Sequence, residues 1–134
     1  MKKKKVLFVC TFNSVRSQMA EGLLTQMKGD EYHVYSAGVE AVGVNPYAIA
    51  VMAEMGINIT HHHSKTVEEV KEKEFDIVVT VCDNARESCP EIPAKKVIHK
   101  NFHNPGTSSM SPAETLQNYR KIRNEIKEWL EKTF

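Results

Sequence analysis

The sequence predicts a single α/β domain over residues 1–134, built on a four-stranded parallel sheet with helices on both faces. Apolar runs of strand length alternate along the chain with segments of helical periodicity, which is typical of parallel strands joined by right-handed crossovers. Residues 75–82 form a nearly continuous apolar run, as expected of a strand buried on both faces of such a sheet. A chain of 134 residues has the size of one domain with a sizeable core.

The first half of the chain predicts two strand–helix pairs. In order, they are a strand at 6–10, a helix ending at about residue 28, a strand at 32–38 and a helix from Pro46 to about Gly56. The start of the second helix is well marked, because Asn45 is a favourable N-cap and proline is favourable at the first helical position.

The second half predicts a short helix, two strands and a long helix. In order, they lie at 67–73, at 75–82, at 96–98 and from Pro112 onward. Ser64 or Thr66 is the expected N-cap of the short helix. The long helix is expected to bury one apolar face, formed by Leu116, Tyr119, Ile122, Ile126, Trp129 and Leu130.

The composition is that of an ordinary soluble domain, with 41% hydrophobic residues, 26% charged residues and a formal net charge of +1. This balance gives no reason to expect a nucleic-acid partner or a membrane surface. The chain has no apolar window of about 18 residues and no signal-peptide pattern, so we expect a cytoplasmic protein. In that reducing compartment the three cysteines are expected to have redox or catalytic roles.

The stretch from Cys10 to Ser17 joins the first strand to the first helix and has the spacing C-x5-R-S. A loop that leads into a helix N-terminus presents unpaired backbone N–H groups to an anion. Arg16 adds a planar guanidinium that can bind a tetrahedral oxyanion through two hydrogen bonds. The candidate substrate-binding residues are therefore Thr11, Phe12, Asn13, Ser14, Val15 and Arg16.

The same environment favours Cys10 as a nucleophile. An ordinary thiol with a pKa of about 8.5 is only about 3% thiolate at pH 7, whereas thiols at helix N-termini beside cations have pKa values of roughly 3.5–7.5. The hydroxyl of Ser17 is placed to donate a further hydrogen bond to the sulfur. The alternative interpretation is that Cys10 is an apolar core residue and Arg16 a solvated helix residue.

Cys82 and Cys89 are separated by six polar or small residues, and Cys82 is expected to end a strand as Cys10 does. A continuous helix between them would hold their Cα atoms roughly 10 Å apart, whereas a disulfide needs about 4.4–6.8 Å. A bond between them therefore requires the segment to be looped, or to unwind on oxidation. Together with Cys10, the pair suggests a relay of three thiols that delivers two electrons. The alternative makes Cys82 a core residue and Cys89 a bystander.

The sequence gives no pattern of a resident metal. Three adjacent histidines, His61 to His63, point in different directions in any regular element, and the other histidines show no recognised zinc spacing. The three cysteines supply no paired C-x2-C elements. We therefore expect these histidines to lie in a polar surface loop, and we expect neither a metal nor an organic cofactor.

Several motifs together resemble the thioredoxin-coupled arsenate reductases, which share the fold of low-molecular-weight protein tyrosine phosphatases. The motifs are C-T-F-N-S-V-R-S-Q-M-A-E from Cys10, Y-S-A-G from Tyr35, V-T-V-C from Val79 and C-P at Cys89. The resemblance implies that Cys10 attacks the arsenic of arsenate, that Arg16 and the loop amides bind it, and that Ser17 holds the thiolate. It further implies that Cys82 releases arsenite and that Cys89 then forms the disulfide that thioredoxin reduces.

Two positions depart from the family pattern. Where the family has an aspartate before proline as general acid, this chain has Asn104, and His103 is a possible substitute acid. Some members have a potassium site built from the equivalents of Asn13, Glu21, Ser36 and an aspartate. Lys65 takes the place of that aspartate, and its ammonium is expected to neutralise Glu21 in place of potassium.

Arsenate reduction by a monomer with thioredoxin as reductant is thus the function that the sequence favours. A low-molecular-weight phosphatase is the alternative enzyme, although it has no use for Cys82 and Cys89 and depends on the aspartate that Asn104 replaces. A non-catalytic oxyanion-binding module is the third interpretation, favoured if no other group supplies the acid.

Overall fold

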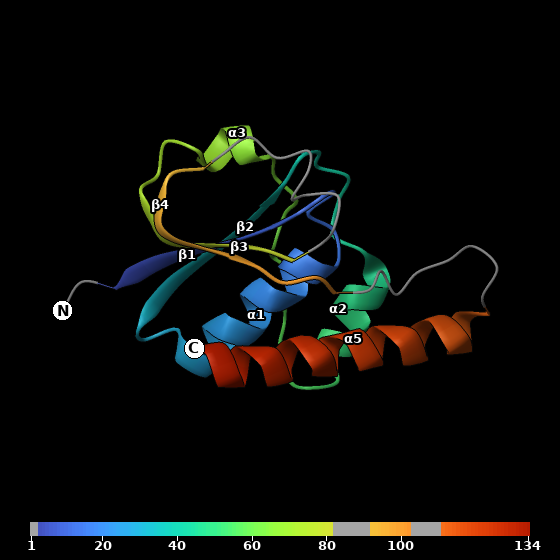
Figure 1. The fold of residues 1–134 in the computed structure, drawn as a ribbon. Helices are drawn as coiled ribbons and strands as arrows, with labels where there is room; N and C mark the ends of the chain where they lie inside the picture. Colours follow the sequence, from blue (N-terminus) through green and yellow to red (C-terminus); the bar gives the residue numbers. More distant parts are fainter. Residues whose placement is uncertain (1–2, 82–91, 103–110) are drawn as a thin grey trace.

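A computed structural model of the chain describes residues 3–81, 92–102 and 111–134. Its strands form one parallel sheet with the order β2-β1-β3-β4 (Figure 1). The strands are β1 (Lys4–Cys10), β2 (Tyr32–Gly38), β3 (Phe75–Thr80) and β4 (Ala94–His99). The predicted four-stranded parallel sheet is confirmed, and β4 is longer than the three residues expected from the sequence.

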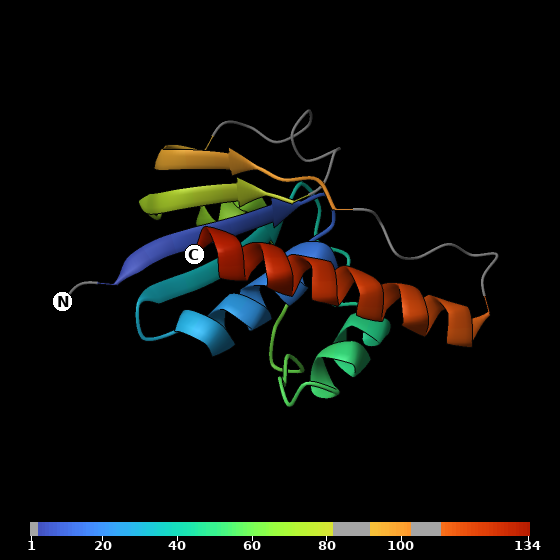
Figure 2. The same ribbon diagram turned by 60° about the horizontal axis from the view of Figure 1, so that its bottom comes forward.

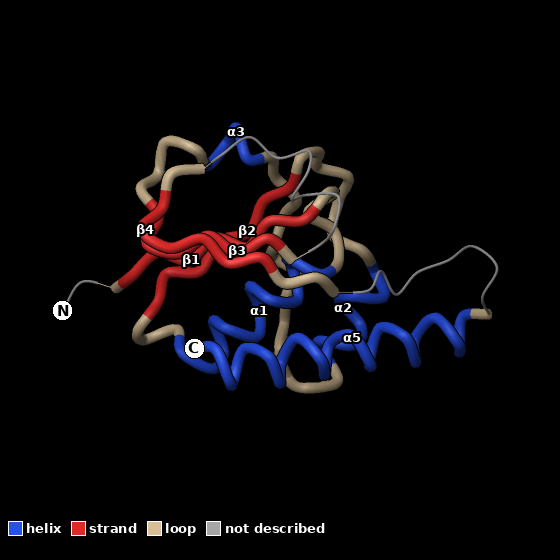
Figure 3. Tube along the Cα trace, viewed as in Figure 1, coloured by secondary structure: helices blue, strands red, loops and turns tan. Residues whose placement is uncertain are grey.

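Helices lie on both faces of the sheet, as predicted. On one face lie α1 (Arg16–Lys28), α2 (Pro46–Ala53) and α5 (Pro112–Thr133), and on the other lies the short α3 (Val67–Val70) (Figures 1 and 2). The colouring by secondary structure in Figure 3 shows the sheet between these two layers. In the described ranges, none of the helices combines the length and the apolar character needed to cross a bilayer.

Local sequence signals account for where the helices begin. At α2, the Asn45 side chain accepts a hydrogen bond from the N–H of Tyr47 at 2.8 Å, and Pro46 is the first helical residue. At α3, Thr66 and Glu69 form a capping box. This helix ends at Val70 rather than at the predicted residue 73, because the charged residues 71–74 offer no further apolar side chain to bury.

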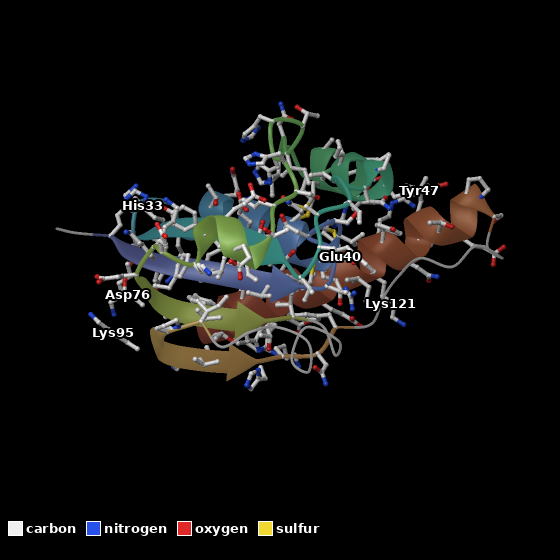
Figure 4. The ribbon with its side chains drawn as sticks, turned by 90° about the horizontal axis from the view of Figure 1, so that it is seen from above. His33, Glu40, Tyr47, Asp76, Lys95 and Lys121 are labelled. Atoms are coloured by element: carbon white, nitrogen blue, oxygen red, sulfur yellow. The ribbon has the colours of Figure 1, made fainter. Side chains whose placement is uncertain are left out.

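The central strand β1 carries the core of the sheet. Residues 6–9 of this strand have no exposed surface, and side chains of α1 and α5 cover them on one side. At the amino ends of the strands, Asp76 of β3 accepts a hydrogen bond from the N–H of Lys5 at 2.8 Å and pairs with Lys95 of β4 at 3.3 Å. Asp76 and Lys95 lie side by side in Figure 4. This contact ties three neighbouring strands together.

The strand order determines where a ligand site can form. From β1 the chain goes to β2 on one side, and β3 then pairs with the other side of β1. In open parallel sheets, ligands bind beyond the carboxyl ends of the strands where such a reversal occurs. The loop at residues 11–15, which follows β1 and leads into α1, lies at this point.

Candidate active site

The carbonyl groups of the loop at residues 11–15 accept hydrogen bonds from a neighbouring segment, which holds the loop in place. The segment at residues 40–45 donates three backbone hydrogen bonds: Glu40 N to Thr11 O (3.0 Å), Val42 N to Phe12 O (3.4 Å) and Asn45 N to Ser14 O (3.0 Å). Within the described part of the chain, the backbone N–H groups of residues 12–15 donate to no other group. Helix α1 also begins without a side-chain cap at Val15. These N–H groups therefore remain available to an anion.

Cys10 ends β1 at the base of this loop and is 2% exposed. Its Sγ lies 2.8 Å from the hydroxyl oxygen of Ser17, in the first turn of α1. Asn13 Nδ2 donates to the same hydroxyl oxygen at 2.9 Å. Because the oxygen of Ser17 already accepts a hydrogen bond, its own hydrogen can point at the sulfur, where it favours the thiolate.

Arg16 is held in place by the end of the sheet. Its Nη1 donates to the carbonyl oxygen of Phe102 at 3.0 Å, which fixes the orientation of the guanidinium plane. Its Nε is buried and has no hydrogen-bond partner among the described residues. Burying an N–H group of a cation without a partner is unfavourable, so this group indicates the position of an acceptor such as an oxyanion.

Asn13 connects the loop to two neighbouring segments. It is fully buried and has φ 49°, a left-handed conformation that asparagine tolerates better than most residues. Its side-chain oxygen accepts hydrogen bonds at 2.9 Å from Gln18 Nε2 and from the N–H of Lys65. A Cβ at Gly38 would lie 2.6 Å from Asn13 N, so β2 can approach the loop this closely only through glycine.

A cluster of charged and polar side chains lies behind the loop, around Glu21 of α1. Ser36 donates to Glu21 at 2.5 Å, Lys65 Nζ lies 4.0 Å from its carboxylate, and His62 Nε2 lies 3.6 Å from it. The pairing of Lys65 with Glu21 that the sequence predicts is therefore present. Among the described residues, no three histidine, cysteine, aspartate or glutamate side chains gather into a metal site.

The prediction of a polar surface loop is wrong for His62. Ile57 and Ile59 are buried and hold the following residues against α1, so that His62 is half-buried and lies 2.9 Å from Gln18 through Nδ1. Burial lowers the pKa of His62, and the nearby Glu21 carboxylate opposes that shift. The sequence carries no periodic signal for this contact, because it joins residues 44 positions apart.

A cavity of about 260 Å³ opens at the loop. Its described lining residues are Cys10, Phe12, Ser14, Val15, Arg16, Val42, Asn45 and Tyr119. The large apolar side chains Phe12 and Val42 are 43% and 59% exposed at this site. The sequence did not predict Val42, Asn45 or Tyr119 as site residues, and Tyr119 was expected only as part of an apolar helix face.

The structure brings together Cys10, Arg16, Ser17 and the loop residues that the sequence predicted as one site. The predicted relay residues Cys82 and Cys89 lie outside the described residues. So do Asn104 and His103, the two positions proposed for the acid.

Comparison with known proteins agrees with this geometry. The family model for low molecular weight phosphotyrosine protein phosphatase matches residues 5–134. The chain is 43% identical to an arsenate reductase of Halalkalibacterium halodurans over 127 residues, which are 94% of this chain and 91% of that protein.

Solved structures show the same likeness. An arsenate reductase in the phosphate-binding state superposes with a TM-score of 0.80 at 31% identity, covering 97% of this chain and 95% of that one. A thioredoxin-dependent arsenate reductase of Corynebacterium glutamicum superposes with a TM-score of 0.69 at 25% identity, covering 97% of this chain and 61% of that one. The chain therefore belongs to the low molecular weight phosphotyrosine protein phosphatase family.

Proposed function

We propose that this chain is an arsenate reductase that works with thioredoxin. The observation that carries the proposal is the buried, unpaired Nε of Arg16, a residue that lines the same cavity as a cysteine hydrogen-bonded to Ser17. This arrangement supports binding of a tetrahedral oxyanion next to a nucleophilic sulfur. The curated and solved arsenate reductases that match nearly the whole chain support arsenate as that oxyanion.

The reaction begins at Cys10. Its thiolate attacks arsenic, an arsenic–oxygen bond breaks, and the departing oxygen leaves as water once it has been protonated. Arg16 and the loop N–H groups bind the remaining oxygens, so charge that develops on them is stabilised where it forms.

The reduction itself requires a second thiol. By the resemblance stated above, Cys82 attacks Cys10 Sγ to form a disulfide, and arsenic keeps the electron pair of the broken sulfur–arsenic bond and leaves as arsenite. Cys89 then attacks Cys82, and thioredoxin reduces the resulting Cys82–Cys89 disulfide. Such a relay needs the reducing conditions of the cytoplasm. We expect the chain to act as a monomer, since all these groups come from one copy.

The proposal is tested by NADPH oxidation with arsenate, thioredoxin and thioredoxin reductase. We expect activity in the wild type and only background rates in Cys10→Ser, Cys82→Ser and Cys89→Ser. Val97→Thr, an exposed change on β4, serves as the control and is expected to retain activity. Full activity in any of the three cysteine variants would contradict the relay.

A phosphatase is the second candidate, because the apolar side chains of Phe12 and Val42 line the same cavity as Cys10 and could contact an aryl group. Hydrolysis of 4-nitrophenyl phosphate measured on the same variants separates the two functions. A phosphatase needs Cys10 but not Cys82 or Cys89, whereas the reductase needs all three.

A further inference from the structure

The first step of the proposed reaction needs a proton for the oxygen that leaves arsenic. Aspartate, glutamate and histidine are the usual donors, but none of them is among the described residues that line the cavity. The only other proton-bearing side chains in that lining, apart from Cys10 and Arg16, belong to Ser14, Asn45 and Tyr119. Tyrosine is the strongest acid of these three.

Tyr119 reaches the cavity from α5, far along the chain from the loop. Its side chain is only 3% exposed, and its ring packs against that of Tyr47, with the ring centroids 5.4 Å apart. Figure 4 shows Tyr47 on α2, next to α5. No hydrogen bond joins the Tyr119 hydroxyl to any group in the described part of the chain. Because Tyr119 lines the cavity and its hydroxyl has no partner among the described residues, that hydroxyl is available to a ligand in the cavity.

The electrostatic surroundings suit a proton donor. Burial raises the pKa of Tyr119, as does Tyr47, whereas the positive charge of Arg16 acts in the opposite direction. The hydroxyl therefore keeps its proton at neutral pH. A phenol is a far stronger acid than water even when burial raises its pKa, so transfer of its proton to a departing hydroxide is favourable.

We infer that Tyr119 is a catalytic residue whose hydroxyl protonates the oxygen that leaves arsenic as Cys10 attacks. In this step the sulfur–arsenic bond forms, the arsenic–oxygen bond breaks, and the tyrosine proton moves to that oxygen, which departs as water. The tyrosinate left behind is stabilised by the Arg16 guanidinium and regains a proton from solvent through the cavity. The inference rests on the proposed arsenate reductase function.

The test compares Tyr119→Phe with Tyr47→Phe, which changes the other member of the same ring pair but not a cavity residue. We expect kcat for arsenate to fall by about 10²-fold in Tyr119→Phe, with a much smaller change in KM, and to stay near the wild-type value in Tyr47→Phe. Phenylalanine keeps the ring, so both variants should fold, which their urea unfolding midpoints check.

A second measurement separates proton donation from a structural role. Iodoacetamide alkylates Cys10 with iodide as the leaving group, which needs no proton. We expect Tyr119→Phe to be alkylated at the wild-type rate while its kcat for arsenate falls about 10²-fold. A parallel loss of both activities would overturn the inference, because it would show that the loop itself had been disturbed.

The remaining outcomes distinguish the inference from the proposed function. Arsenate reduction that persists in Cys10→Ser would overturn the proposed function. If Cys10→Ser is inactive and Tyr119→Phe is as active as Tyr47→Phe, only the inference fails. The acid must then come from elsewhere, and His103→Gln would test the position that the sequence suggested.

Discussion

Asn13, in the loop at residues 11–15, makes hydrogen bonds to several partners at once. Asn13 uses its side-chain oxygen for Gln18 and Lys65 and its side-chain nitrogen for Ser17, while its own carbonyl accepts from Ser64 at 2.6 Å. A buried polar group with all its partners holds one conformation strongly. The loop therefore presents its N–H groups to an anion before one binds, so little reorganisation is needed during the reaction.

Ser17→Ala tests the hydrogen bond to the nucleophile. The variant removes the hydroxyl that lies 2.8 Å from Cys10 Sγ and also leaves Asn13 Nδ2 without its acceptor. Loss of one hydrogen bond to a thiolate, worth roughly 1.5–3 kcal/mol, is expected to slow alkylation by iodoacetamide at pH 7 by about tenfold or more.

Thr25→Ala is the matched control, because Thr25 is an exposed hydroxyl residue on the same helix. Its alkylation rate should equal that of the wild type. Equal rates for Ser17→Ala and the wild type would show that Ser17 does not stabilise the thiolate.

Lys65 leads to a prediction about ions. Its ammonium lies 4.0 Å from the Glu21 carboxylate, which also receives a hydrogen bond from Ser36. Because the carboxylate already has a cation beside it, we expect equal melting temperatures and equal arsenate reduction in potassium chloride and sodium chloride of the same ionic strength. A melting temperature that rises in potassium alone would contradict this role of Lys65.

At the level of elements, the sequence predicted those helix ends that neighbouring residues along the chain determine. Asn45 and Pro46 mark the start of α2, and Gly29 follows the end of α1, as expected. The length of β4 could not be predicted, because its end residues, Ala94 and His99, are in the strand only through pairing with β3. Tyr119 and His62 were missed as site residues for the same reason, since their contacts join segments far apart in the chain.

Glu54 links α2 to α5 and gives a prediction about acid stability. Its carboxylate accepts hydrogen bonds from Arg120 and Arg123, at 2.8 Å and 2.9 Å, and Arg123 also donates to the carbonyl of Val51 at 2.7 Å. These arginines, Arg120 first, lower the pKa of Glu54 from 4.5 to about 2. The ionised Glu54 therefore contributes its full stability through the two arginines above pH 4.5, and this contribution is lost as the pH falls toward 2.

Glu54→Gln should unfold at lower urea concentration than the wild type at pH 6. The difference in unfolding free energy between the two proteins should shrink steadily as the pH is lowered from 4.5 toward 2. A difference that stays constant with pH would show that the charge of Glu54 is not what joins the helices.

At the scale of the whole molecule, α5 joins parts of the chain that are far apart in sequence. It packs on α1 and α2, carries Tyr119 to the cavity, and places Trp129 within 6.0 Å of Phe102, whose carbonyl holds Arg16. At the end of this helix, the Phe134 ring contacts Tyr32 and Phe8, with centroids 5.4 Å and 6.3 Å apart. The site and the core thus share the same packing, which supports the prediction of one domain.

Ile126→Ala tests whether the chain unfolds as one unit. Ile126 is fully buried on α5, and replacing a buried isoleucine by alanine removes packing worth about 2–5 kcal/mol. We expect urea unfolding followed by Trp129 fluorescence and by far-ultraviolet circular dichroism to give one coincident transition in the wild type and in the variant. That transition should be shifted to lower urea in the variant.

Val97→Thr, exposed on β4, is the control and should unfold at the wild-type midpoint. Because α5 covers the sheet and also supplies the cavity with Tyr119, loss of arsenate reduction should follow the same curve. Two separated transitions would mean that α5 and the sheet do not form a single cooperative core.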